Sequence, residues 1–144
     1  MIKNILNLGD AALYCDFGTE INKETNTQVI RYFKGIQKEN IEGINNLTPS
    51  YNKLIISFDL RKKNFKDLKK LIENLEIDES EKLKNKKVKI PVCNDESFSL
   101  DIKRLEEKLK IKRDVIYEKF FNKEFFCYMT GFIAGMPFLG DLDK

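Results

Sequence analysis

The 144-residue sequence contains no histidine. This absence excludes the Ser-His and Cys-His pairs that activate a nucleophile. It also removes the usual general base at neutral pH and the commonest metal ligand. Any chemistry must therefore use carboxylates, lysines, thiols or backbone groups. No convincing general base stands out among these, so the sequence assigns no catalytic residue, no cofactor-binding residue and no metal ligand.

Long apolar runs are absent as well. No stretch approaches the roughly 20 apolar residues that a membrane-spanning helix needs. Residues 1–13 lack the long apolar core and the small-residue cleavage site of a signal peptide. The 26 basic and 23 acidic side chains nearly balance and are interspersed along most of the chain. We therefore expect a cytoplasmic protein with neither nucleic acid nor a membrane as its partner.

Cysteine is scarce, and its placement favours a structural role. Cys15, Cys93 and Cys127 are widely spaced, odd in number, and each lies in an apolar, strand-like stretch. No basic partner is visible that would lower a thiol pKa, so core thiols are favoured over a catalytic nucleophile. We predict three reduced thiols in the core of a cytosolic protein.

The first half of the chain alternates two hydrophobic periods. Short stretches with a strand period come in two pairs, and each pair is followed by a segment with a helical period. Asn22 and Asn64 are plausible N-caps for the two helices. The predicted fold class of residues 1–77 is α+β, an antiparallel sheet with two helices on one face. The strands are expected over residues 2–8, 12–17, 44–47 and 54–58.

The second half is predicted as a separate, incomplete domain. Residues 78–86 are polar and charged without periodicity, which is typical of an interdomain linker. Residues 87–144 hold two strand-like stretches and two short helical patterns, which is marginal for a domain without disulfides or metals. We therefore expect further chain beyond Lys144, or a partner that substitutes for it. The strands are expected over Val88–Cys93 and Phe125–Met129, and the helices over 99–109 and 115–120.

Three clusters in this half favour structural interpretations over functional ones. The lysine-rich run at 82–89 has acidic neighbours and no interleaved aromatics, so a solvated linker is favoured over a phosphate or membrane patch. Asp95 and Glu96, without histidine, are read as turn residues and not as an acid-base pair or metal site. Six aromatic residues fit the core of an unfinished barrel better than a platform for a planar ligand. These are Phe120, Phe121, Phe125, Phe126, Tyr128 and Phe132.

The end of the chain combines features that rarely occur together. Residues 131–143 read GFIAGMPFLGDLD, with three glycines and Pro137 in an otherwise apolar segment. The segment is neither a Walker loop nor the GxGxxG dinucleotide fingerprint. Glycine serves positions that need backbone freedom or close approach of another group. A structural turn and a loop that lines a ligand or faces a partner both remain open.

This ending resembles a known signature, GFxPGFPYLGGLDP. It belongs to the carboxyltransferase-domain family that includes allophanate hydrolase subunit 1, the B component of 5-oxoprolinase and the sporulation kinase inhibitor KipI. LGDAAL at 8–13 resembles the family's opening GDxAL, LIISFD at 54–59 its second hairpin, and IPVC at 90–93 its IPVCYxxxFGPDL. Order and spacing agree in all four places. Among the departures, Ala134 replaces the signature's first proline, and the chain is shorter than the family.

The resemblance implies an N-terminal α+β domain followed by the opening part of a cyclophilin-like β-barrel domain. It also implies a non-autonomous B component of an ATP-dependent 5-oxoprolinase, which opens 5-oxoproline to glutamate. The implied partners are a C-type companion carboxyltransferase subunit and a LamB/YcsF-type subunit. ATP would act at the level of the complex, with no cofactor site evident in this chain.

Three alternatives to this function remain open. They are a component of an allophanate-type amidohydrolase, a KipI-like inhibitor that binds a histidine kinase, and an inactive truncated fragment. The resemblance also implies a set of residues that line the substrate cleft or an intersubunit surface. These are Gly131, Phe132, Gly135, Pro137, Gly140 and Asp143.

Overall fold

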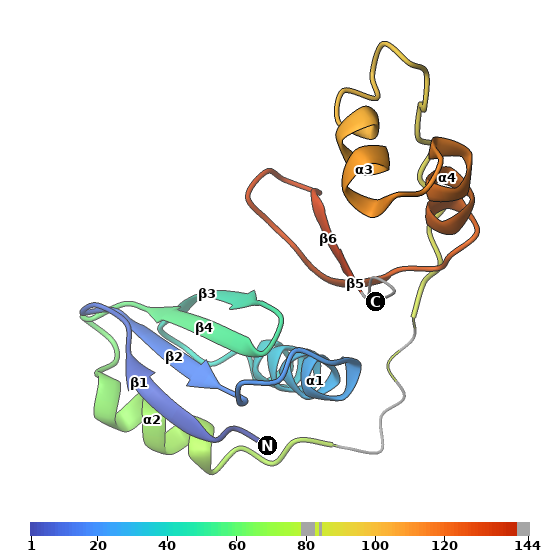
Figure 1. The fold of residues 1–144 in the computed structure, drawn as a ribbon. Coiled ribbons are helices and arrows are strands. Elements are labelled where there is room, and N and C mark those ends of the chain that lie inside the picture. Colours follow the sequence, from blue (N-terminus) through green and yellow to red (C-terminus); the bar gives the residue numbers. More distant parts are fainter. Residues whose placement is uncertain (79–82, 84, 141–144) are drawn as a thin grey trace. The chain divides into compact units, whose positions relative to one another are not determined.

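The structure is a computed structural model that describes residues 1–78, 83 and 85–140 (Figure 1). The described residues form two compact units. The first contains the residues up to Leu83 together with those from Phe126 onward, and the second contains the residues between them. No helix among the described residues is long and apolar enough to cross a membrane.

A four-stranded antiparallel sheet forms the centre of the first unit, in the order β1-β2-β4-β3. The predicted pairs of strands are confirmed, because β1 pairs with β2 and β3 pairs with β4. The two central strands, β2 and β4, lie in a register that places Leu13 opposite Ile56. The strands are β1 (Asn4–Asn7), β2 (Ala12–Asp16), β3 (Ile44–Pro49) and β4 (Lys53–Phe58).

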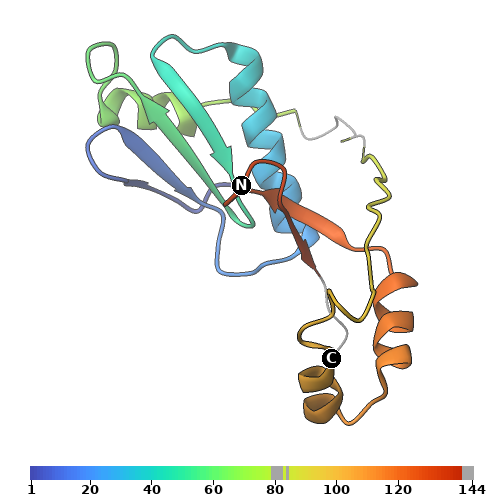
Figure 2. The ribbon, with the colours of Figure 1, turned by 90° about the horizontal axis from the view of Figure 1, so that it is seen from above.

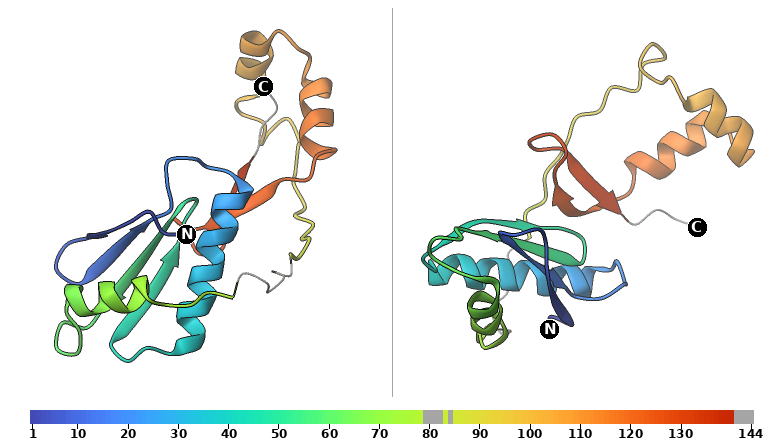
Figure 3. Two further views of the ribbon diagram at one scale, coloured as in Figure 1. Left: turned by 90° about the horizontal axis from the view of Figure 1, so that it is seen from below. Right: turned by 90° about the vertical axis from the view of Figure 1, so that its left-hand side faces the viewer.

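Two helices cover one face of this sheet, as predicted: α1 (Lys23–Glu39) and α2 (Phe65–Glu73) (Figure 3). Each begins at an asparagine whose side-chain oxygen accepts a hydrogen bond from a backbone N–H in the first turn. Alternate side chains of β2 and β4 point toward the helices and pack with them into one core. The buried apolar residues are Ile5, Leu13, Cys15, Phe17, Val29, Ile36, Leu54, Ile56, Phe58, Leu68 and Ile72.

Gly35 lies inside α1, where glycine ordinarily weakens a helix. A Cβ atom at this position would lie 2.6 Å from Cδ1 of Ile77. The segment that follows α2 therefore packs directly against the helix backbone at Gly35. Glycine at this position lowers the helix propensity, but its missing side chain allows Ile77 to approach the backbone of α1 closely.

Strands β5 (Phe126–Thr130) and β6 (Pro137–Gly140) form a separate two-stranded antiparallel sheet. A register shift interrupts the pairing between Cys127 and Met129. The contacts of this hairpin group it with the first unit, beside α1 (Figure 2). The predicted division into domains over 1–77 and 87–144 stays a prediction, as does the cyclophilin-like barrel.

The second unit contains the two predicted helices, α3 (Ile102–Leu109) and α4 (Arg113–Phe121). The strand predicted over Val88–Cys93 is wrong, because this segment has no regular secondary structure. A strand needs a neighbour for its backbone N–H and C=O groups. Within the described residues no backbone group of Val88–Cys93 has a hydrogen-bonding partner.

The prediction of core positions is also wrong for several side chains. Cys15 is buried, and burial raises the pKa of its thiol to about 12. Cys93 and Cys127, by contrast, are exposed. Of the six aromatic residues, only Tyr128 is buried, while Phe120, Phe121 and Phe132 are exposed. The reason is common to all: within each unit, no second layer of described residues covers these side chains.

Candidate functional site

Residues 131–136 of the glycine-rich ending form the loop that joins β5 to β6, and Pro137–Gly140 form β6 itself. Gly131 N donates to Met136 O at 3.1 Å, Ile133 N donates to Gly131 O at 2.7 Å, and Met136 N donates to Ile133 O at 3.0 Å. These bonds close the loop on itself. Gly135 has a φ of +82°, a left-handed conformation that favours glycine. The loop is therefore a structural turn with a defined backbone shape.

Three backbone N–H groups of this loop take no part in its closure. Phe132, Ala134 and Gly135 donate no hydrogen bond to any described residue. Their N–H groups are free to bind an anion or a carbonyl oxygen from outside the chain.

The loop also exposes apolar side chains. Phe132 is 91% exposed and has a φ of +62°, which is uncommon for a residue with a side chain. Ile133 and Met136 are exposed as well. An exposed apolar loop tip next to free backbone donors is typical of a surface that receives a ligand or a partner. The loop is therefore a structural turn and also has the exposed groups expected of a loop that lines a ligand or faces a partner.

A buried asparagine of α1 holds the hairpin. Nδ2 of Asn26 donates to the carbonyl oxygens of Ser50 at 3.1 Å, Tyr51 at 3.0 Å and Tyr128 at 3.1 Å. Asn26 is 2% exposed. One side chain thus joins α1, the β3–β4 turn and β5.

Side-chain contacts reinforce this anchor. The ring of Tyr51 packs against Tyr128 with 5.5 Å between centroids, and against Phe138 of β6 in an edge contact with 6.2 Å between centroids. Ser50 Oγ lies 3.3 Å from Met129 Sδ. These contacts therefore fix the strands β5 and β6 to the core of the first unit, and the strands in turn hold the loop between them.

The six residues expected to line a cleft are not all brought together. Gly131, Phe132, Gly135 and Pro137 lie in or beside the loop. Gly140 lies at the other end of β6, opposite Phe126. A Cβ atom on Gly140 would lie 2.9 Å from Cε2 of Tyr128, so this glycine makes room for the anchoring ring. Asp143 lies outside the described residues.

Sequence reasoning assigned no role to Asn26 or Tyr51, and it placed Tyr128 only in an aromatic core. A signal for Asn26 is present: it occupies the same helical stripe as Val29, Phe33 and Ile36. A polar residue within an apolar stripe is buried, and a buried amide must find hydrogen-bonding partners. The pattern does not say where the partners lie along the chain.

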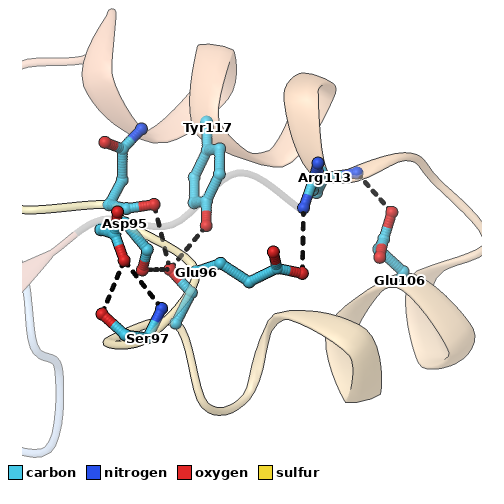
Figure 4. Close-up of polar contacts among 8 residues, drawn as sticks. Asp95, Glu96, Ser97, Glu106, Arg113 and Tyr117 are labelled. Carbon is cyan, nitrogen blue, oxygen red and sulfur yellow. Dashed lines mark hydrogen bonds and ion pairs between the residues drawn. The ribbon is translucent and has the colours of Figure 1, made fainter.

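A polar cluster occupies the second unit (Figure 4). Asp95 Oδ1 accepts from Ser97 N at 2.9 Å and from Ser97 Oγ at 2.6 Å. These bonds hold the pKa of Asp95 below its ordinary value. Asp95 is therefore a turn residue, as predicted, and no group of acidic or thiol side chains in the described ranges could hold a metal ion.

A shallow cavity of about 260 Å³ adjoins this cluster. Arg113 spans it, with its backbone N donating to Glu106 Oε1 at 2.7 Å and its Nη1 lying 3.7 Å from Glu96 Oε1. The carboxylates of Glu96 and Glu106 on its rim therefore already have partners, whereas Lys103, which also lines the cavity, has no ion pair among the described residues.

The carboxyl groups with a shifted pKa are poor candidates for a general base near neutral pH. Wherever a carboxyl pKa departs from its ordinary value among the described residues, it is lowered. The cause in Asp16 is first the hydrogen bond from Lys53, and in Asp59 the hydrogen bond from Arg61. A general base needs a pKa close to the working pH.

Comparison with known proteins shows which family this chain resembles. The family model described as carboxyltransferase domain, subdomain C and D, matches residues 3–144. The B component of 5-oxoprolinase from Bacillus subtilis (strain 168) is 28% identical over 152 aligned residues, covering 97% of this chain and 63% of that protein. The chain thus spans less than two thirds of the length of this relative.

Solved structures share the fold. A crystal structure of TTHA0988 matches with a TM-score of 0.76 at 22% identity, covering 93% of this chain and 26% of that chain. The conserved uncharacterized protein PH0987 from Pyrococcus horikoshii matches with a TM-score of 0.50 at 29% identity, covering 97% of this chain and 65% of that chain. In each case the chain corresponds to part of a longer polypeptide.

Proposed function

Because the chain belongs to the carboxyltransferase domain (subdomain C and D) family, we propose that it is the B component of an ATP-dependent 5-oxoprolinase. The single observation that carries this proposal is its match, over nearly the whole chain, to the B component of a 5-oxoprolinase. In the proposed reaction the lactam of 5-oxoproline is opened to glutamate at the expense of ATP.

The loop supports a role in stabilising charge. Attack on a lactam carbonyl develops negative charge on its oxygen, and preorganised N–H donors stabilise that charge. The unpaired N–H groups of Phe132, Ala134 and Gly135 are such donors. We propose that this loop faces the substrate or the protein that holds it.

The same chemistry requires partner proteins. Use of ATP calls for cationic groups that clamp transferring phosphate, and proton transfer calls for a base. Neither is assembled among the described residues. We propose that a C-type companion carboxyltransferase subunit and a LamB/YcsF-type subunit supply both, in a cytoplasmic complex.

Reconstitution tests this function. The three purified proteins are mixed with ATP and 5-oxoproline, and glutamate release is measured. We expect release to require this chain, and to fall with Phe132→Asp, which puts charge on the loop tip. The matched control is Leu60→Asp, an exposed apolar position in the turn after β4. Full glutamate release in the absence of this chain refutes the proposal.

A further inference from the structure

Strand β5 contains a β-bulge at Tyr128. The residues before and after it pair with Leu139 and Phe138, which are adjacent on β6, so Tyr128 is the extra residue of β5. A bulge bends its strand and increases the local twist, and it therefore sets the direction in which the chain continues. From this bend the chain runs into the loop at 131–136, which begins three residues further on, about 10 Å along an extended strand.

The bulge is held by a side chain of α1. Asn26 Nδ2 donates to Tyr128 O at 3.1 Å, and this hydrogen bond is buried. The three atoms that Nδ2 contacts are all carbonyl oxygens, which accept hydrogen bonds and cannot donate them. The amide nitrogen and not the amide oxygen must therefore face them. Helix α1 thus fixes the point at which β5 bends.

A second contact acts on the residue after the bulge. Ser50 Oγ donates to Met129 Sδ at 3.3 Å. At the other end of the thioether, Met129 Cε lies 3.0 Å from the place that a Cβ atom on Gly131 would occupy. Gly131 N in turn donates to Met136 O and closes the loop. The core of the first unit therefore reaches the backbone of the loop through two adjacent residues of β5.

The amide of Asn26 gives this arrangement its direction. Hydrogen bonds are directional, and a buried amide whose hydrogens both have acceptors favours one arrangement of the backbone groups around it. An apolar side chain in the same helical stripe would pack without that directional requirement. The polar residue at position 26 therefore specifies where the bulge lies, in addition to filling space.

We propose that Asn26 is a positioning residue for lactam opening: by binding the carbonyl of the bulge, it sets the direction of the loop at 131–136. This inference rests on the proposed function, in which the free N–H groups of that loop face the substrate or the protein that holds it. Donors stabilise a developing oxyanion only when they are already in place. A displacement of about 1 Å that originates far from the chemistry can lower a rate about a hundredfold.

Steady-state kinetics of the reconstituted complex test this role, with saturating ATP and varied 5-oxoproline. We expect Asn26→Ala to lower kcat about tenfold or more and to change KM less than about threefold, because stabilisation of the transition state is lost and substrate binding is not. The matched control is Asn52→Ala, which also removes a buried amide, with its hydrogen bond to Gly18 O, but leaves the contacts of Asn26 in place. Its kcat should stay within about twofold of the parent value.

Amide NMR spectra of the free chain give a second readout. The signals of residues 131–136 should shift in Asn26→Ala and stay in place in Asn52→Ala. If Asn26→Ala does not fold, Tyr51→Leu replaces it, because this variant removes the ring that packs against Tyr128 and keeps the backbone carbonyl of position 51. Its kcat should fall about threefold or more.

Unchanged kcat in a folded Asn26→Ala complex overturns the inference and leaves the proposed function standing, because the parent complex still releases glutamate. Equal losses of kcat in Asn26→Ala and Asn52→Ala also overturn it, since they report only the stability of the unit. Where Tyr51→Leu is the variant used, an unchanged kcat has the same meaning. If the parent complex releases no glutamate, the proposed function fails and the inference fails with it.

Discussion

Replacing Asn26 tests what fixes the β5–β6 hairpin to the core. Its Nδ2 has two hydrogens and three carbonyl acceptors, at 3.0 to 3.1 Å. Asn26→Ala removes these bonds and opens a small cavity. Two neutral hydrogen bonds at about 1 kcal/mol each, plus about 1 kcal/mol for the cavity, give a loss near 3 kcal/mol.

Asn26→Asp is the sharper perturbation, because an ionised carboxylate only accepts hydrogen bonds and would face three carbonyl oxygens. An unpaired buried charge costs about 3–5 kcal/mol. The surroundings favour the protonated acid, so the pKa of this carboxyl in the folded state lies above its unfolded value. The stability of the variant is therefore highest at low pH and is lost as pH rises through the raised folded pKa.

The assay combines urea denaturation with hydrogen exchange of β5 and β6. Asn52→Ala is the matched control, because Asn52 is also buried and donates to Gly18 O at 2.8 Å, but among the described residues it makes no hydrogen bond to β5 or β6. Both variants should lower the free energy of unfolding. Only Asn26→Ala should speed exchange in β5 and β6 before the rest of the unit opens. Equal exchange of the hairpin in the two variants would refute the role of Asn26 as its anchor.

Three further predictions concern single positions. Gly140→Ala places a Cβ 2.9 Å from the Tyr128 ring and should cost about 1–3 kcal/mol in urea unfolding, with exchange in β5 rising; no loss would show that the ring moves freely. Asp16→Asn removes a carboxylate whose pKa is lowered by Lys53. That carboxylate stabilises the fold above about pH 4 and loses the effect as pH falls through its folded pKa, so the difference in Tm between parent and variant should shrink on acidification. Ala134→Pro removes one of three free N–H groups while inserting the proline of the resembled signature. Glutamate release should be retained, because the N–H groups of Phe132 and Gly135 stay available as donors, and a complete loss would make the Ala134 N–H essential.

Sequence reasoning predicted the elements whose signals are local. Asn22 and Asn64 were identified as N-caps, and each accepts a hydrogen bond from the first turn of its helix. The sheet strands carried alternating apolar residues and were placed within a few residues. Within the glycine-rich segment, residues 131–136 form the expected loop, because glycine acts on the backbone where it stands, whereas the strand β6 (Pro137–Gly140) was not predicted.

The sequence predictions that were wrong share a physical cause: each depended on contacts with residues far away in the sequence. Val88–Cys93 has a strand pattern but no adjacent strand among the described residues, and Cys127 alternates correctly on a hairpin with nothing over its outward face in the described part of the unit. A side-chain pattern states which face prefers burial, whereas burial itself needs another layer. The roles of the candidate site residues at 131–143 were likewise drawn from a family resemblance and remain to be tested by activity.

The sequence alone determined where helices begin, which residues alternate and where the chain turns, since these follow from hydrogen bonds and sterics within a few residues. Only the tertiary structure decided that Asn26 binds the carbonyl of Tyr128, 102 residues further along. It likewise decided that Gly35 admits the side chain of Ile77. Such contacts join residues far apart in the chain. Their partners are selected by how the layers pack, and a local pattern carries no information about that choice.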